Sequence, residues 1–190
     1  MILDAIKELE LLSKQGKSYS DSNGRFGWRN PVRSDTGPIL TRIVTEERPS
    51  RILEIGTGHG LSTLYLAMGL NAGQGAIQTL EFDEVVAQST QDTMDRCGVP
   101  VSVLTGDACE TIPTLNGHFD IVFFDAQKNQ YYAQLMLLLE HNLIGTGTVI
   151  LADNVTDRRT ECQPFLDWFD DNQVKHHILE TECGLLVARF

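Results

Sequence analysis

The chain has 190 residues, of which 42% are hydrophobic and 22% charged, and these proportions are typical of one globular domain with a substantial core. Its formal net charge of −11 opposes binding to a phosphate polymer, which needs clustered Lys and Arg. We therefore expect a small-molecule partner rather than a nucleic acid.

Charged side chains interrupt the apolar residues at the N-terminus, so we expect neither a signal peptide nor a membrane span, and a cytoplasmic protein. Apolar residues at helical spacing predict a helix over residues 2–15. Residues 17–34 are polar and Gly-rich without a period, which predicts a lid-like loop. The segment 34–47, with an early Pro38 after an N-cap candidate, predicts a second helix.

From residue 51 onward, short apolar segments alternate with amphipathic ones, which predicts βαβ units and a parallel sheet between two helical layers. The predicted strands are 51–56, 76–81, 101–105, 119–124 and 147–152, and the predicted helices are 60–70, 84–97, 107–115, 128–143 and about 159–172. Two final apolar segments, 174–181 and 184–190, are joined by a link too short for a parallel return. We therefore expect an α/β three-layer sandwich with a seven-stranded, mostly parallel sheet that ends in an antiparallel hairpin. Residues 1–190 would form a single domain, in which 1–34 precede a core at 35–190.

The segment "RILEIGTGHG" places Gly56, Gly58 and Gly60 directly after the first predicted strand, where glycine lets the backbone approach a ligand closely. Glu54 lies inside that buried strand, and a buried acidic side chain is costly unless it meets a donor or a positive charge. A sulfonium ligand that also carries an ammonium group supplies such a charge, whereas a pyrophosphate would be repelled.

Two further acidic residues follow the next two strands. Glu81 lies 25 residues after Gly56, near the position where an acid binds ribose hydroxyls in nucleotide-binding α/β folds. Asp107 is placed to bond an adenine amine, and a role as helix N-cap is an equal alternative for it.

The segment "ILEIGTGHGLST", followed by "LEFD" and "GDA", resembles the class I S-adenosylmethionine-dependent methyltransferases. This resemblance implies a Rossmann-like fold with S-adenosylmethionine as the cofactor. The cofactor-binding residues would be Val32, Glu54, Gly56, Thr57, Gly58, Gly60, Ser62, Glu81, Phe82, Asp107, Ala108 and Asp125.

Hard oxygen ligands follow two further predicted strands. "FFDAQK" contains Asp125 and Lys128, and "ILADN" contains Asp153 and Asn154. Neighbouring strands lie about 5 Å apart, so two carboxylates and a carboxamide at successive strand ends are able to meet at one cation. Such ligands suit Mg²⁺, with Ca²⁺ or Mn²⁺ as alternatives.

The segments "FFDAQKNQYY" and "ILADNV" resemble the divalent-metal-dependent O-methyltransferases of the catechol and caffeoyl-CoA group. The resemblance implies metal ligands at Asp125, Asp153 and Asn154, a general base at Lys128, and an acceptor that contacts Trp28, Lys128 and Asn154. The acceptor would be a small catechol-like molecule with vicinal hydroxyls. Methylation of a hydroxyuridine in tRNA, or cofactor binding without catalysis, remain alternatives, and a homodimer is expected by analogy.

Overall fold

The structure is a computed structural model that describes residues 1–14, 31–70 and 75–190. Most of the predicted lid-like loop, including Trp28, therefore lies outside the described residues. The elements are α1 Ile2–Lys14, α2 Thr36–Glu47, β1 Arg51–Ile55, α3 Leu61–Gly69, β2 Ala76–Glu81, α4 Glu84–Cys97, β3 Val101–Thr105, α5 Ala108–Thr111, η1 Ile112–Thr114, β4 Ile121–Phe124, η2 Lys128–Gln130, α6 Tyr131–Glu140, β5 Val149–Ala152, α7 Arg159–Asp171, β6 Lys175–Leu179 and β7 Leu185–Arg189.

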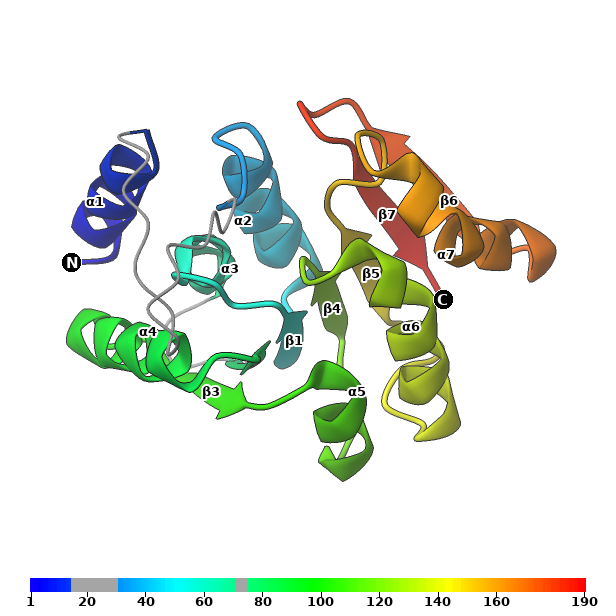
Figure 1. Cartoon of the computed structure of the whole chain (residues 1–190), viewed down its shortest axis with the longest axis horizontal. Helices are drawn as coiled ribbons and strands as arrows, with labels where there is room; N and C mark the ends of the chain where they lie inside the picture. The colour runs from blue at the N-terminus through cyan, green and yellow to red at the C-terminus, as the bar shows by residue number, and fades with distance from the viewer. Residues whose placement is uncertain (15–30, 71–74) are drawn as a thin grey trace.

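The strands form one seven-stranded sheet in the order β3-β2-β1-β4-β5-β7-β6 (Figure 1). Strands β1 to β5 pair in parallel, whereas β7 pairs antiparallel with both β5 and β6. The predicted α/β architecture, with its antiparallel C-terminal hairpin, is confirmed. The carboxyl ends of β4 and β5 are adjacent, since Phe124 pairs with Ala152.

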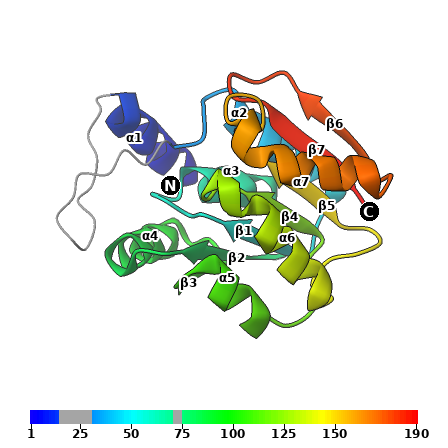
Figure 2. The same cartoon turned by 45° about the vertical axis from the view of Figure 1, so that its right-hand side comes forward.

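Helices cover both faces of the sheet (Figure 2). Helices α2, α3 and α4 pack on one face, against strand residues that include Ile52 and Phe123, and α1 packs against α3 and α4. Helices α5, α6 and α7 pack on the other face, against Leu53 and Phe124 among others. Successive strand residues point to opposite faces, and β4 and β5 are apolar on both sides, as expected for buried parallel strands. Strand β1 departs from this pattern at Glu54, and β2 departs from it at Gln78 and Thr79.

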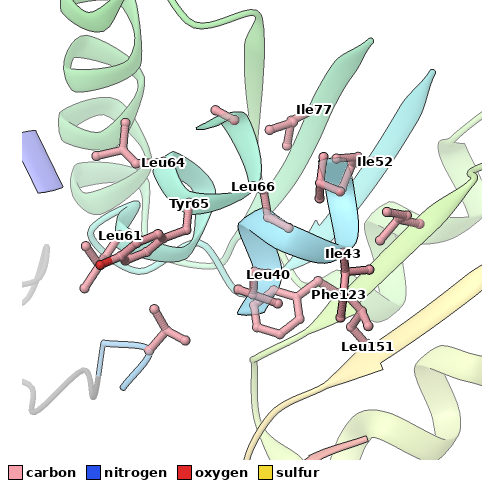
Figure 3. Packing of buried hydrophobic residues seen from close by; sticks show 14 of the residues in the cluster. Leu40, Ile43, Ile52, Leu61, Leu64, Tyr65, Leu66, Ile77, Phe123 and Leu151 are labelled. Atoms are coloured by element: carbon pink, nitrogen blue, oxygen red, sulfur yellow. The ribbon is translucent and has the colours of Figure 1, made fainter. Parts of the chain in front are cut away.

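The first of these two cores joins α2 and α3 to the sheet. Leu40 and Ile43 of α2 meet Ile52, Phe123 and Leu151 of three neighbouring strands (Figure 3). These residues are at most 5% exposed. Removing one such large side chain costs roughly 2–5 kcal/mol, so this packing fixes β1 and α3, which flank the glycine turn.

Three local details differ from the sequence-based expectation. The helix predicted over 107–115 is the short α5 followed by the 3-10 turn η1, because Pro113 has no N–H for a helical hydrogen bond. The helix predicted over 128–143 begins with η2 and ends at Glu140, shortly before Asn142 adopts a left-handed φ of 54°. Asp35 makes no side-chain cap on α2, and its carboxylate instead accepts a 2.7 Å hydrogen bond from the N–H of Glu182.

None of the helices within the described ranges combines the length and the apolar character that crossing a membrane requires.

Candidate active site

A cavity of about 710 Å³ opens at the carboxyl ends of the parallel strands. Open α/β sheets bind ligands at this edge. Its lining residues are Pro31, Val32, Gly56, Thr57, Gly58, His59, Leu61, Ser62, Leu80, Glu81, Phe82, Gly106, Asp107, Ala108, Asp125, Ala126, Gln127, Lys128, Asn129, Gln130, Asn154, Asp157, Arg158 and Glu161.

The glycine turn after β1 needs glycine for two separate reasons. Gly56 has a φ of 98°, and a Cβ added there would lie 2.7 Å from the backbone of Asp125 and Ala126. Gly58 has a φ of 52°, which a side chain rarely tolerates, and an added Cβ would meet no atom within 4 Å. Gly56 therefore permits the close contact of β1 with the end of β4, and Gly58 leaves its backbone open to the cavity.

The backbone of Gly58 is held from both sides. Its N–H donates a 2.9 Å hydrogen bond to Oε2 of Glu81, and its carbonyl accepts a 2.9 Å bond from the hydroxyl of Thr90 on α4. Methyl groups of Thr90 and Met94 also fill the space where a Cβ of Gly60 would lie. The turn is thus fixed before any ligand binds.

The acids at the carboxyl ends of β2 and β3 both line the cavity and both bond to nearby backbone. Glu81 accepts 2.9 Å bonds from the N–H groups of Gly58 and Asp83. Asp107 accepts a 2.8 Å bond from the N–H of Cys109 and so caps α5. The capping alternative for Asp107 is therefore realised, without removing its carboxylate from the cavity wall.

Glu54 lies beneath the glycine turn, outside the cavity lining. It points toward the face that α3 covers, and its Oε2 accepts hydrogen bonds from Thr63 (2.6 Å) and Thr79 (2.7 Å). Burial raises the pKa of Glu54 to about 7, although these hydroxyls and that of Ser62 oppose the increase. Through these hydrogen bonds Glu54 connects β1, β2 and α3 beneath the glycine turn.

Asp125 and Lys128 form an ion pair at the end of β4. Lys128 Nζ lies 2.9 Å from Asp125 Oδ1 and donates a 3.0 Å bond to the carbonyl of Ala126. The side chain of Lys128 is only 13% exposed, and that of Asp125 is only 11% exposed. Burial raises the pKa of Asp125, and the nearby Lys128 charge partly offsets this effect.

Asp153 continues β5 beside Asp125, since its N–H donates a 3.0 Å bond to the carbonyl of Phe124. Burial and the negative charge of Asp125 raise the pKa of Asp153 to about 7. Its buried Oδ1 has no hydrogen-bond partner among the described residues. The next residue, Asn154, adopts a left-handed φ of 65° and lines the cavity.

These donors fit a hard divalent cation. The carboxylates of Asp125 and Asp153 repel each other in a buried position, and Oδ1 of Asp153 has no hydrogen-bond partner among the described residues. A bound cation would offset this repulsion and provide a partner for that oxygen. Within residues 1–14, 31–70 and 75–190, no group of three or more His, Cys, Asp or Glu side chains is arranged to hold a metal. The expected ligand set is of a different kind, because its third member is the carboxamide of Asn154.

The cavity brings most of the expected site residues together. Those that line it are Val32, Gly56, Thr57, Gly58, Ser62, Glu81, Phe82, Asp107, Ala108, Asp125, Lys128 and Asn154. Glu54, Gly60 and Asp153 lie outside the lining. Trp28, expected to face the acceptor, falls outside the described residues.

Sequence reasoning did not identify the residues at the open rim of the cavity. Asp157, Arg158 and Glu161 come from the start of α7 and the loop before it, and Gln127, Asn129 and Gln130 come from η2 and its preceding residue. Arg158 and Glu161 follow Asn154 by four and seven residues. Because Asn154 lies outside a helix and α7 begins at Arg159, this spacing does not place them, and the sequence offers no other signal for their position.

The glycine turn, the acids at the ends of β2, β3 and β4 and the sheet order together fit the fold of the class I S-adenosylmethionine-dependent methyltransferases. The chain belongs to the methyltransferase domain family, whose model matches residues 53–155. The resemblance seen in the sequence is thereby confirmed.

Similar proteins include catechol O-methyltransferases from two organisms. The protein from Mycobacterium tuberculosis is 38% identical over 130 residues, which cover 67% of this chain and 58% of that protein. The protein from Mus musculus is 36% identical over 135 residues, which cover 67% of this chain and 51% of that protein. The chain thus spans little more than half the length of these relatives.

A solved structure also resembles the fold over nearly the whole chain. It is the crystal structure of an O-methyltransferase from Bacillus cereus in complex with SAH, with a TM-score of 0.81 and 26% sequence identity. The alignment covers 97% of this chain and 90% of the other.

Proposed function

We propose that the protein transfers a methyl group from S-adenosylmethionine to an oxygen of a small catechol-like acceptor with vicinal hydroxyls, and that a divalent cation assists the transfer. One observation carries this proposal: the carboxylates of Asp125 and Asp153 lie at adjacent strand ends, next to a cavity that the glycine turn also lines. Relatives named as catechol O-methyltransferases support the choice of acceptor.

The end of the cavity near the glycine turn suits the methyl donor, which supplies an electrophilic methyl group on a sulfonium. Glu81 and Asp107 offer carboxylate oxygens to ribose hydroxyls and to an adenine amine. Phe82 is 74% exposed and gives this region an apolar surface for the base. The fixed backbone of Gly58 lowers the ordering cost of binding.

The other end suits the acceptor. Asp125, Asp153 and Asn154 would hold Mg²⁺, or Ca²⁺ or Mn²⁺, which when bound favours the ionised form of a hydroxyl that contacts it.

Lys128 is the residue that would take the hydroxyl proton. Its Nζ is held by Asp125 Oδ1 and the carbonyl of Ala126, so the amine has a defined position at the cavity wall. The acceptor oxygen then attacks the methyl carbon directly while the bond from that carbon to sulfur breaks, so that S-adenosylhomocysteine leaves and no covalent enzyme intermediate forms. Positioning and charge therefore carry most of the rate.

The test is transfer of a labelled methyl group to a panel of catechols, with and without a chelator. We expect chelation, and separately Asp153→Ala, to reduce transfer by at least about a hundredfold. Asp171→Ala, at the exposed C-terminus of α7, is the matched control and should retain activity.

Transfer that survives both chelation and Asp153→Ala would refute the role of the cation. Transfer to tRNA but to no catechol would instead support the nucleic-acid alternative. Binding of S-adenosylmethionine without any transfer would support a non-catalytic protein.

A further inference from the structure

The lining of the cavity divides into two chemically different parts. Larger apolar residues belong to the cofactor end, namely Leu61 at the start of α3, Leu80 on β2 and Phe82 just after it. The lining residues on either side of Lys128 and at the start of α7, apart from Ala126, are polar or charged: Gln127, Asn129, Gln130, Asp157, Arg158 and Glu161. Pro31 and Val32 also line the cavity. An acceptor seated at Lys128 therefore meets polar groups beyond its reacting oxygens.

An ion pair lies at the centre of this polar rim. Nε and Nη2 of Arg158 both lie 2.6 Å from Oε1 of Glu161. The two side chains are 52% and 39% exposed, and the start of α7 lies against η2, which carries Lys128. Both members of the pair line the cavity and are partly exposed to solvent.

The donors of Arg158 are only partly used by this pair. A guanidinium carries five N–H groups in one plane, and it has no acceptor atom. The described residues use Nε and Nη2 and give Nη1 no partner. A ligand group that hydrogen-bonds to Arg158 must therefore offer oxygen or another acceptor atom.

We propose that Arg158 determines the acceptor specificity, and that it selects catechols whose ring substituent carries hydroxyl, carbonyl or carboxylate oxygens over those with an alkyl substituent. An alkyl substituent would displace water from the polar rim without replacing the hydrogen bonds that the water made to the rim, and this is unfavourable. An oxygen-bearing substituent replaces those bonds with charge-assisted ones. This inference rests on the proposed function.

The experiment compares three acceptors: unsubstituted catechol, a catechol with a short alkyl chain, and a catechol with a carboxylate chain of equal length. We expect the wild-type protein to have the highest kcat/KM for the carboxylate acceptor. In Arg158→Ala, the loss for that acceptor should exceed the loss for unsubstituted catechol by about tenfold. Arg159→Ala removes the same charge from the neighbouring exposed residue, which does not line the cavity, and should keep the wild-type ratios.

A wild-type preference for the alkyl acceptor, or equal losses for all three acceptors in Arg158→Ala, would overturn the role of Arg158. If Arg159→Ala changed the kcat/KM ratios as much as Arg158→Ala, the effect would be a general one of net charge. That result would also overturn the role of Arg158. Failure to methylate any of the three catechols is a different result, because it would contradict the proposed function itself.

Discussion

The N–H of Gly58 donates a 2.9 Å hydrogen bond to the carboxylate of Glu81, which ties the turn after β1 to the end of β2. The same carboxylate lines the cavity, where we place the ribose of the methyl donor. One side chain therefore shapes the turn and offers acceptor oxygens to the ligand.

Replacing Glu81 should weaken binding of the methyl donor. We expect Glu81→Ala to raise the dissociation constant of S-adenosylmethionine, measured by calorimetry, by about tenfold or more, because charge-assisted hydrogen bonds are lost. Glu84→Ala, an exposed change in the first turn of α4, is the control. An unchanged affinity in Glu81→Ala would count against the ribose assignment.

Thr90 should act as a positioning residue for the cofactor turn, since it does not line the cavity but bonds to the carbonyl of Gly58. Thr90→Val keeps the shape and loses that bond, so we expect a several-fold weaker affinity for S-adenosylmethionine with little change in KM for the acceptor. Thr90→Ser should restore the affinity. Thr93→Val on the same helix loses only bonds to Ser89 and Arg96 within that helix and serves as control. Loss of affinity in Thr93→Val as well would show a general effect on α4.

The buried carboxyl of Glu54 should make stability fall as pH rises. Its pKa is about 7 in the folded chain against 4.5 in the reference state, so between these values the folded state keeps a proton that the unfolded state releases. The stabilisation is complete below about pH 4.5 and is lost as pH rises through about 7.

Glu54→Gln cannot titrate and should remove this contribution. Relative to the wild type, we expect its free energy of unfolding to gain up to about 3 kcal/mol between about pH 5 and about pH 8, measured by urea denaturation. Glu140→Gln, at the exposed end of α6, should follow the wild type. Parallel pH profiles for Glu54→Gln and the wild type would contradict the prediction.

Cation binding should be visible in thermal stability as well as in activity. Mg²⁺ would offset the repulsion between Asp125 and Asp153, so at neutral pH it should raise the Tm of the wild-type chain. At a concentration of about 100 times the dissociation constant, the expected gain is about 2.7 kcal/mol. Asp153→Asn should abolish most of this gain, whereas Asp171→Asn should retain it. A Tm in the wild type that does not respond to Mg²⁺, Mn²⁺ or Ca²⁺ would contradict a cation site.

Much of the fold could be read from periodicity alone. Buried parallel strands need apolar residues on both faces, so segments such as "FDIVFF" indicate their own position in the sheet. The link before Gly184 is too short for anything but an antiparallel neighbour, which the pairing of β6 with β7 confirms. Pro113 marks in the sequence the point where the helix predicted over 107–115 breaks. The periodic pattern of that segment nevertheless led to the prediction of one continuous helix.

The sequence by itself determined which residues follow the parallel strands, and this placed Gly56, Gly58, Glu81 and Asp125 at the cavity, because parallel strands end at one edge of the sheet. Only the tertiary structure decided which way the other side chains face. The pleat of β1 turns Glu54 toward Thr63 and Thr79, and the packing of α7 brings Arg158 to the rim. Such directions depend on contacts between segments far apart in the chain, which no local spacing encodes.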